Sequence, residues 1–419
     1  MKILWISNII FPEALKILTG EGTLKSSGGW LLGLADALVR TKDISLSVAF
    51  LSPLVNELRV IQGEKLNYYI IPYGKGNLKY NKEYEVYWKS IQEKTKPDVV
   101  HIHGTEYSHG LAYINACGAT NVVVSIQGLV SAVNYYYYYG LSISDIIKNI
   151  TLRDLLRGTI FQDKKSFKLR GELEKELLLN VHHVIGRTSW DLARTLEINP
   201  NINYHFCNET LRPDFYDGSV WSYRNCKKHS IFLSQASYPI KGLHQLLKAM
   251  PIILRYYPDT IIRIAGVDIT QKKQYKGVLS FITGYGLLVK KMINSLELDG
   301  HVLFVGNLNA EEMKQEYLKA NVFVCPSSIE NSPNSLGEAQ ILGVPCVCSY
   351  VGGIPDMMRG DEGHLYRFEE TSMLAKCICD IFANKGSQVN MKDIARARHD
   401  KDKNTRDLLN IYKEILSKQ

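Results

Sequence analysis

Short apolar runs rich in β-branched and aromatic residues alternate along this chain with longer stretches whose apolar positions follow a helical period. In the first half, the runs that predict strands are residues 2–9, 44–51, 67–71, 98–103, 121–127 and 181–185. In the second half, they are residues 231–234, 261–265, 302–305, 322–325 and 345–349. The alternation of strands and helices predicts α/β domains with doubly wound, mainly parallel sheets.

The pattern also indicates where one domain ends and the next begins. At 419 residues the chain is long enough for two domains of ordinary size. Residues 208–229 have no clear period and contain several charges and turn residues, which is typical of a connection. We therefore expect an N-terminal Rossmann-like domain over residues 1–210 and a C-terminal Rossmann-like domain over residues 225–395.

Two carboxylates flank the start of a predicted helix in the second half. The strand at residues 322–325 ends in a loop that carries Glu330, and Ser335 then opens a helix with Glu338 in its first turn. Parallel α/β sheets bind ligands beyond the carboxyl ends of their strands, where helix amides attract phosphates. We expect the helix start at Asn334 and Ser335 to bind a diphosphate. Glu330 would contact the group attached to the diphosphate, and Glu338 would contact two hydroxyls of a ribose.

Each of these acids has a simpler interpretation. Ser335 and Glu338 match a capping box, in which Glu338 only satisfies a backbone N–H of its own helix, and Glu330 could be an exposed loop acid. The surrounding sequence favours a site, because residues 321–356 resemble the nucleotide-sugar signature of glycosyltransferase family 4, a GT-B family. The resemblance consists of E-x7-E from Glu330 to Glu338, Gly343 with Pro345, and the turn Gly352-Gly353 with Pro355.

The resemblance implies a GT-B fold, with two Rossmann-like domains facing a cleft and a C-terminal helix, here residues 396–419, that crosses back to the first domain. It implies transfer of a sugar, with retention of configuration, from a nucleotide diphosphate sugar to a hydroxyl of a glycan or glycolipid. The expected setting is surface polysaccharide or lipopolysaccharide assembly in the cytoplasm. Such enzymes generally need no metal or other cofactor.

The family pattern transfers to several residues of the C-terminal domain. Lys241 matches in type and spacing a lysine that holds the diphosphate, and with Glu330 it is predicted to be catalytic. Gln235 stands where the family commonly has an arginine, which removes one charge-assisted contact to the diphosphate. Gly266 follows the strand at residues 261–265 and is predicted to let the backbone pass close to the nucleotide.

In the N-terminal domain the match is looser. Gly28 and Gly29 precede a helix and resemble a family loop near the leaving group of the donor, although they could simply form a tight turn. Gln127 occupies the place of a histidine found in many members, so it could bind a sugar hydroxyl but could not titrate. Arg187, in the sequence GRTSWD, is predicted either to contact donor or acceptor or to form a structural ion pair.

Composition excludes some classes of site. The eight cysteines fall largely inside apolar strands and helices, as expected of core thiols in a reducing compartment. Their spacing lacks the zinc pattern and at most one of His101 and His103 is predicted to contact a ligand, so we predict no metal. The N-terminal apolar run ends at Pro12 with no cleavage site, and no run approaches the roughly 20 residues of a membrane span.

Charge suggests which partners to expect. The formal net charge of +8 favours anions such as nucleotide phosphates or an acidic lipid surface, and we predict no nucleic-acid partner. Five tyrosines at residues 135–139 lead into a basic stretch over residues 148–170 that also has an apolar side. A basic amphipathic helix of this kind could lie on the inner face of an anionic membrane. The alternative is a surface helix packed on its own domain with a solvated basic face.

Other functions fit parts of the pattern. A nucleotide-sugar epimerase of the same architecture would interconvert donors without an acceptor. A non-catalytic nucleotide-sugar-binding subunit is suggested by Gln127 and Gln235, which replace the titratable and charged residues of the family. A dinucleotide-dependent oxidoreductase is disfavoured, because no G-x-G-x-x-G follows a strand.

Overall fold

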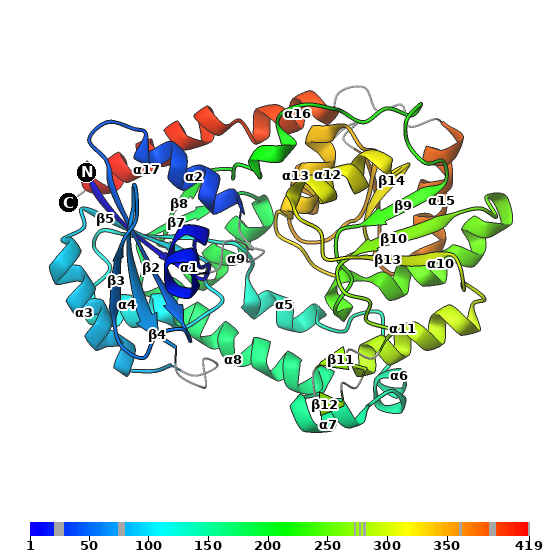
Figure 1. The fold of residues 1–419 in the computed structure, drawn as a ribbon, viewed down its shortest axis with the longest axis horizontal. Coiled ribbons are helices and arrows are strands. Elements are labelled where there is room, and N and C mark those ends of the chain that lie inside the picture. The colour runs from blue at the N-terminus through cyan, green and yellow to red at the C-terminus, as the bar shows by residue number, and fades with distance from the viewer. Residues whose placement is uncertain are drawn as a thin grey trace. The chain divides into compact units, whose positions relative to one another are not determined.

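The computed structural model describes residues 1–20, 29–73, 80–271, 274–275, 278–279, 282–359, 363–384 and 391–417 (Figure 1). Contacts within the chain divide it into two compact units. Unit 1 consists of Met1–Ala132, Ser166–Pro213 and His399–Gln419. Unit 2 consists of Val133–Lys165 and Asp214–Arg398.

Unit 1 is built on an eight-stranded sheet in the order β3-β4-β2-β1-β5-β6-β7-β8. Neighbouring strands are parallel except β3 and β4. The central strands are buried on both faces, which explains why their sequences are continuously apolar. The strands are β1 (Lys2–Ser7), β2 (Ser45–Ser52), β3 (Arg59–Gln62), β4 (Asn67–Pro72), β5 (Val99–His103), β6 (Val122–Ser125), β7 (His183–Gly186) and β8 (Asn203–Phe206).

Helices cover this sheet and bury one apolar cluster on each face. Leu31 of α2 and Leu408 of α17 belong to one cluster, and Trp88 of α3 belongs to the other. The Tyr412 hydroxyl of α17 accepts a hydrogen bond from Trp5 Nε1 at 3.1 Å, so the last helix is held in unit 1. The helices wholly in unit 1 are α1 (Pro12–Thr19), α2 (Gly29–Val39), α3 (Glu83–Thr95), α4 (His109–Cys117), α9 (Ser189–Ile198) and α17 (Lys401–Ser417).

Unit 2 contains a six-stranded sheet in the order β13-β10-β9-β14-β15-β16, with all neighbouring strands parallel. The loops that follow these strands therefore leave from the same edge of the sheet. The strands are β9 (Ser230–Leu233), β10 (Ile261–Ala265), β13 (Val302–Gly306), β14 (Val322–Cys325), β15 (Cys346–Ser349) and β16 (His364–Tyr366), with a separate hairpin of β11 (Gln274–Tyr275) and β12 (Val278–Leu279).

One apolar core joins the sheet of unit 2 to helices α10, α11 and α15. None of the helices in the described part of the chain is long and apolar enough to span a bilayer. The helices of unit 2 are α6 (Ile143–Lys148), α7 (Leu152–Arg157), α10 (Leu243–Tyr256), α11 (Gly284–Ser295), α12 (Ala310–Lys319), α13 (Asn334–Leu342), α14 (Ile354–Met357), α15 (Thr371–Ala383) and α16 (Met391–Arg398).

The structure confirms two doubly wound, mainly parallel sheets and differs from the sequence prediction in two respects. Strands β3, β8 and β16 and the hairpin strands β11 and β12 were not predicted. β3, β8 and β16 lie at sheet edges, where short, partly exposed strands lack an apolar run. Residues 133–165, which the sequence assigned to the N-terminal domain, belong to unit 2.

The predicted basic amphipathic helix is divided in the structure. Its residues lie in α5 (Val130–Tyr136), α6, α7 and α8 (Ile160–Leu179), and α5 and α8 each contain a boundary between the two units. Glycines interrupt the helical path, because Gly140 and Gly158 have φ values of +80° and +110°.

Candidate functional site

Two loops at one edge of the unit 2 sheet bring the predicted catalytic residues together. β9 and β14 are neighbouring parallel strands. The loop after β9 ends in the 3-10 turn η2 (Pro239–Lys241), and the loop after β14 carries Glu330. The Ser328 N–H donates to the Ile240 carbonyl at 2.8 Å and ties the two loops to each other.

Two glycines fix these loops. Gly242 has a φ of +68°, and a Cβ there would lie 1.7 Å from the Pro326 carbonyl oxygen. Gly352 has a φ of +52°, and a Cβ there would lie 1.9 Å from the Glu330 carbonyl oxygen, which also accepts a hydrogen bond from the Gly353 N–H at 3.0 Å. The Gly352-Gly353 turn of the family motif thus brings the chain close to the Glu330 backbone.

The predicted catalytic residues form an ion pair. Lys241 Nζ lies 2.6 Å from Glu330 Oε1, and the Ser327 hydroxyl donates to the same oxygen at 2.8 Å. Burial lowers the pKa of Lys241, but the charge of Glu330, its hydrogen bond with the ammonium and the nearby Tyr238 together outweigh burial, so the pKa is raised above its ordinary value. The two side chains remain 20% and 14% exposed. Lys241 is therefore a protonated ammonium group that an anion can reach from solvent.

Helix α13 starts directly after the Glu330 loop. Its N-cap is Pro333 without a side-chain cap, and the helix begins at Asn334, so Ser335 lies inside the first turn. The capping-box interpretation of Ser335 and Glu338 is therefore wrong. Glu338 lies further along α13 and is only 4% exposed. The amides of the first turn give this edge of the sheet a partial positive charge.

The remaining predicted residues of unit 2 lie at the same edge. Gln235 is exposed in the loop after β9. Gly266 follows β10 with a φ of +106°, and a Cβ there would meet only Ser237 Oγ, at 3.9 Å, so the space above this glycine is open. Gln235, Lys241, Gly266 and Glu330 thus follow three adjacent strands, as expected of a ligand site in a parallel sheet.

Arg187 and Gln127, two of the predicted residues of unit 1, contact the same buried carboxylate, that of Glu209. Arg187 makes an ion pair with Glu209, and its Nη2 donates to the Ile126 carbonyl at 2.8 Å. The Gln127 Nε2 donates to Glu209 Oε1 at 2.7 Å. Of the two interpretations of Arg187, the structure shows the ion pair. Glu209 was missed, because an acid within a charged, aperiodic stretch has no local signal that it is buried.

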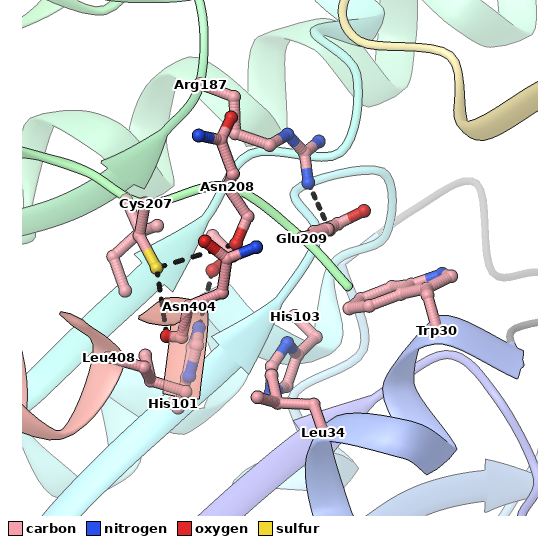
Figure 2. A pocket seen from close by; sticks show the side chains of 12 residues that line it. Trp30, Leu34, His101, His103, Arg187, Cys207, Asn208, Glu209, Asn404 and Leu408 are labelled. Carbon is pink, nitrogen blue, oxygen red and sulfur yellow. Dashed lines mark hydrogen bonds and ion pairs between the residues drawn. The ribbon is translucent and has the colours of Figure 1, made fainter. Parts of the chain in front are cut away.

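A small cavity lies beside this cluster (Figure 2). Its volume of about 20 Å³ suffices for a water molecule. His101 is bonded on both ring nitrogens, to the Tyr412 hydroxyl and the Ser125 hydroxyl, each at 2.6 Å. Neither ring nitrogen of His103 has a partner among the described residues. Burial lowers the pKa of His101 to about 3 and that of His103 well below its ordinary value, so both rings are neutral. The cavity is lined by Trp30, Leu34, His101, His103, Ser125, Ile185, Arg187, Cys207, Asn208, Glu209, Asn404 and Leu408.

The predicted glycine loop of unit 1 can be followed only in part. Gly28 lies outside the described residues. Gly29 is the first residue of α2, and a Cβ there would lie 2.8 Å from Cγ of Arg212. The closest neighbour of Gly29 is thus a side chain of unit 1.

Glu106, just beyond β5, has a raised pKa. Burial raises its pKa from 4.5 to about 7, the nearby Glu174 carboxylate adds to the shift, and Arg170 and Arg187 oppose it. The carboxylate accepts a hydrogen bond from Asn8 Nδ2 at 3.2 Å. Because the folded state disfavours ionisation of Glu106, folding should become less favourable as pH rises from about 4.5 to about 7.

We expect Glu106→Gln to remove this penalty, because glutamine keeps the acceptor for Asn8 without a charge. The variant should exceed wild type in free energy of unfolding by about 1–2 kcal/mol at pH 8 and match it near pH 4.5, measured by denaturant titration. The exposed Glu93→Gln in α3 is the control and should change stability by less than about 0.5 kcal/mol at either pH. An unchanged pH dependence in Glu106→Gln would contradict the assignment.

All eight cysteines are free thiols, and six of them are buried. Within the described ranges, no group of three or more His, Cys, Asp or Glu side chains is arranged to hold a metal ion.

Comparison with known proteins connects this site to a family. Residues 223–398, which contain every predicted site residue of unit 2, match the family model described as glycosyl transferases group 1. One curated relative is the GDP-mannose-dependent alpha-(1-6)-phosphatidylinositol monomannoside mannosyltransferase of Mycolicibacterium smegmatis, 26% identical over 154 residues, or 35% of this chain and 36% of the relative. The chain spans about two fifths of the length of the curated relatives it matches.

Solved structures resemble the chain over its full length. Sucrose-phosphate synthase from Thermosynechococcus elongatus has a TM-score of 0.69 at 17% identity and covers 100% of both chains. Anabaena Alr3699/HepE in complex with UDP has a TM-score of 0.64 at 15% identity and covers 99% of this chain and 100% of its own. These likenesses show the GT-B fold, and with the family match they support a glycosyltransferase.

Proposed function

We propose that this chain is a retaining glycosyltransferase that moves a sugar from a nucleotide diphosphate sugar to a hydroxyl of a glycan or glycolipid. The observation that carries the proposal is the Lys241–Glu330 pair at the carboxyl edge of the unit 2 sheet, inside the region that matches the family model. UDP in Alr3699/HepE and the GDP-mannose named for the mycobacterial relative support a nucleotide-sugar donor.

The chemistry requires positive charge at the leaving group. As the bond from the anomeric carbon to the diphosphate breaks, the carbon gains oxocarbenium character and the phosphate oxygens gain negative charge. Lys241 and the first amides of α13 would stabilise that charge without help from a metal. The attacking hydroxyl would pass its proton to a phosphate oxygen on the same face, so the reaction needs no histidine at Gln127.

Glu330 has two parts in this scheme. Its carboxylate pairs with the Lys241 ammonium at 2.6 Å. It would also accept hydrogen bonds from hydroxyls of the donor sugar while the ammonium contacts the diphosphate. Glu338 would accept bonds from the ribose, and Gly266 would let the nucleotide approach the backbone. The acceptor is proposed to be a component of a surface glycan or glycolipid, as the name of the phosphatidylinositol mannoside transferase suggests.

A thermal-shift screen of nucleotide sugars tests the proposal. A cognate donor at about 100 times its Kd should raise the free energy of unfolding by about 2.7 kcal/mol. Transfer of that donor's sugar to an acceptor hydroxyl would then be followed by NMR, which also reports the anomeric configuration of the product. Binding without transfer or slow hydrolysis would favour a non-catalytic binding subunit, and conversion of the sugar without acceptor would favour an epimerase.

The Gln235 position offers a gain-of-binding prediction. An arginine side chain in this exposed loop would add a charge-assisted contact to the diphosphate, so Gln235→Arg should tighten donor binding by about three- to tenfold. Isothermal titration calorimetry with the cognate donor measures the change. The control Gln315→Arg places the same charge on an exposed position of α12. Equal affinities in the two variants would show that Gln235 does not face the diphosphate.

A further inference from the structure

Helices α6 and α7 form a short pair attached to unit 2 beside α11 (Figure 1). Their inward face is well anchored. Ile146 is 4% exposed, and the Thr151 hydroxyl donates to the Ile282 carbonyl at 2.9 Å. Asp154 completes a capping box with Thr151 and packs on Gly284 so closely that a Cβ there would lie 2.6 Å from Asp154 Oδ2. We call the exposed sides of the two helices, opposite these contacts, their outward face.

That outward face is apolar. Spacings of three and four residues place its members on one side of each helix. A helix on the surface of a water-soluble protein normally turns polar residues outward, and a contiguous exposed apolar patch marks a binding surface. This face also differs from the solvated basic face considered as the alternative from sequence. Its members are Ile143, Ile147, Leu152, Leu155 and Leu156, exposed by 60%, 55%, 54%, 70% and 73%.

Basic residues accompany the patch. Residues 143–165 contain five Lys or Arg and three Asp. Lys148, Arg157 and Lys165 are exposed, as are Asp145 and Asp163, whereas Asp154 is buried in the capping box and so contributes little outward charge. Apolar residues with basic neighbours match the headgroup region of an anionic bilayer, where lipid tails, phosphates and water meet.

We propose that the outward face of α6 and α7 is a docking surface for an anionic lipid bilayer. The five apolar side chains insert at the level of the headgroups, and Lys148, Arg157 and Lys165 contact lipid phosphates. The surface is independent of the proposed catalytic site, so its test does not depend on finding a substrate. A second copy of the chain, the other occupant an apolar patch could accept, carries the same net charge of +8, whereas the basic rim favours an anionic partner.

Co-sedimentation of the full chain with vesicles tests the proposal. Vesicles of phosphatidylglycerol and phosphatidylcholine should bind the protein, vesicles of phosphatidylcholine alone should bind it at least about tenfold more weakly, and added salt should reduce binding to the first. The double variant Leu155→Ser with Leu156→Ser should bind anionic vesicles at least about tenfold more weakly. Val86→Ser and Tyr256→Ser are controls, since these residues are 70% and 72% exposed on α3 and α10.

A fluorescence measurement reports insertion directly. The emission of a tryptophan introduced by Leu156→Trp should shift to shorter wavelength when anionic vesicles are added, whereas that of Val86→Trp should not. Circular dichroism confirms that each variant is folded. Undiminished vesicle binding by the double serine variant, or no preference for anionic lipid, would overturn the proposal. Wild-type self-association that the same double variant abolishes, without vesicle binding, would assign the patch to a second copy of the chain.

Discussion

Replacing Lys241 with alanine is expected to lower kcat for sugar transfer by about 10²- to 10³-fold, the usual cost of removing one group that stabilises charge in a transition state. Lys241 is protonated in the folded protein and lies at the sheet edge where the diphosphate is proposed to bind. Removing it also leaves the Glu330 carboxylate without its cationic partner. The unpaired carboxylate would repel the departing phosphates. Steady-state kinetics with the cognate donor measures the effect.

Three variants separate this role from a structural one. Lys241→Arg keeps the charge but changes the shape of the donor group, so it should retain part of the rate. Glu330→Gln keeps the ammonium and should cost less than Lys241→Ala, about tenfold in kcat. Lys291→Ala removes an exposed lysine of α11 and should leave kcat unchanged. A folded Lys241→Ala variant with kcat within about twofold of wild type would refute the proposed function.

The strands of both sheets were largely predictable, because a central parallel strand is apolar on both faces and its signal is local. The order of the strands in each sheet was not predictable, and neither was the unit to which residues 133–165 belong. That segment is held in unit 2 by bonds between residues distant in sequence: His244 Nε2 to the Tyr139 carbonyl at 3.1 Å, and the Ser328 hydroxyl to the Tyr136 carbonyl at 2.9 Å. No local pattern reports such contacts.

The candidate site, too, was predictable from the sequence only in part. Lys241 and Glu330 were identified by their motif, but their ion pair, across 89 positions, depends on β9 and β14 being neighbours. The glycine pair at 352–353 was recognised as a turn, whereas its neighbour, the Glu330 backbone, could be seen only in the fold. Gln127 was predicted to bind substrate, and Arg187 either to contact substrate or to form an ion pair. Sequence does not report that Glu209, a carboxylate from the connecting stretch, engages both.

The buried pair of Arg187 and Glu209 leads to the largest expected effect on stability. Both side chains are at most 10% exposed, so removing one leaves the other charge buried without its partner. Arg187→Met should therefore lower the free energy of unfolding by about 3–5 kcal/mol, measured by denaturant titration. The exposed pair of Arg194 and Glu197 in α9 is the control, and Arg194→Met should cost less than about 1 kcal/mol.

A second substitution shows whether the loss of stability comes from the buried Glu209 carboxylate that has lost its cationic partner. Adding Glu209→Gln to Arg187→Met removes the buried charge and keeps an acceptor for Gln127, so the double variant should recover at least about half of the loss. If Arg187 served mainly to hold a substrate, Arg187→Met would unfold like wild type and show only a raised KM. Stability near wild type would thus favour the substrate-contact interpretation of Arg187 over the structural one. A large loss that Glu209→Gln restores would place it in the core of unit 1, where a buried cation and two acceptors fix the ends of β6 and β7.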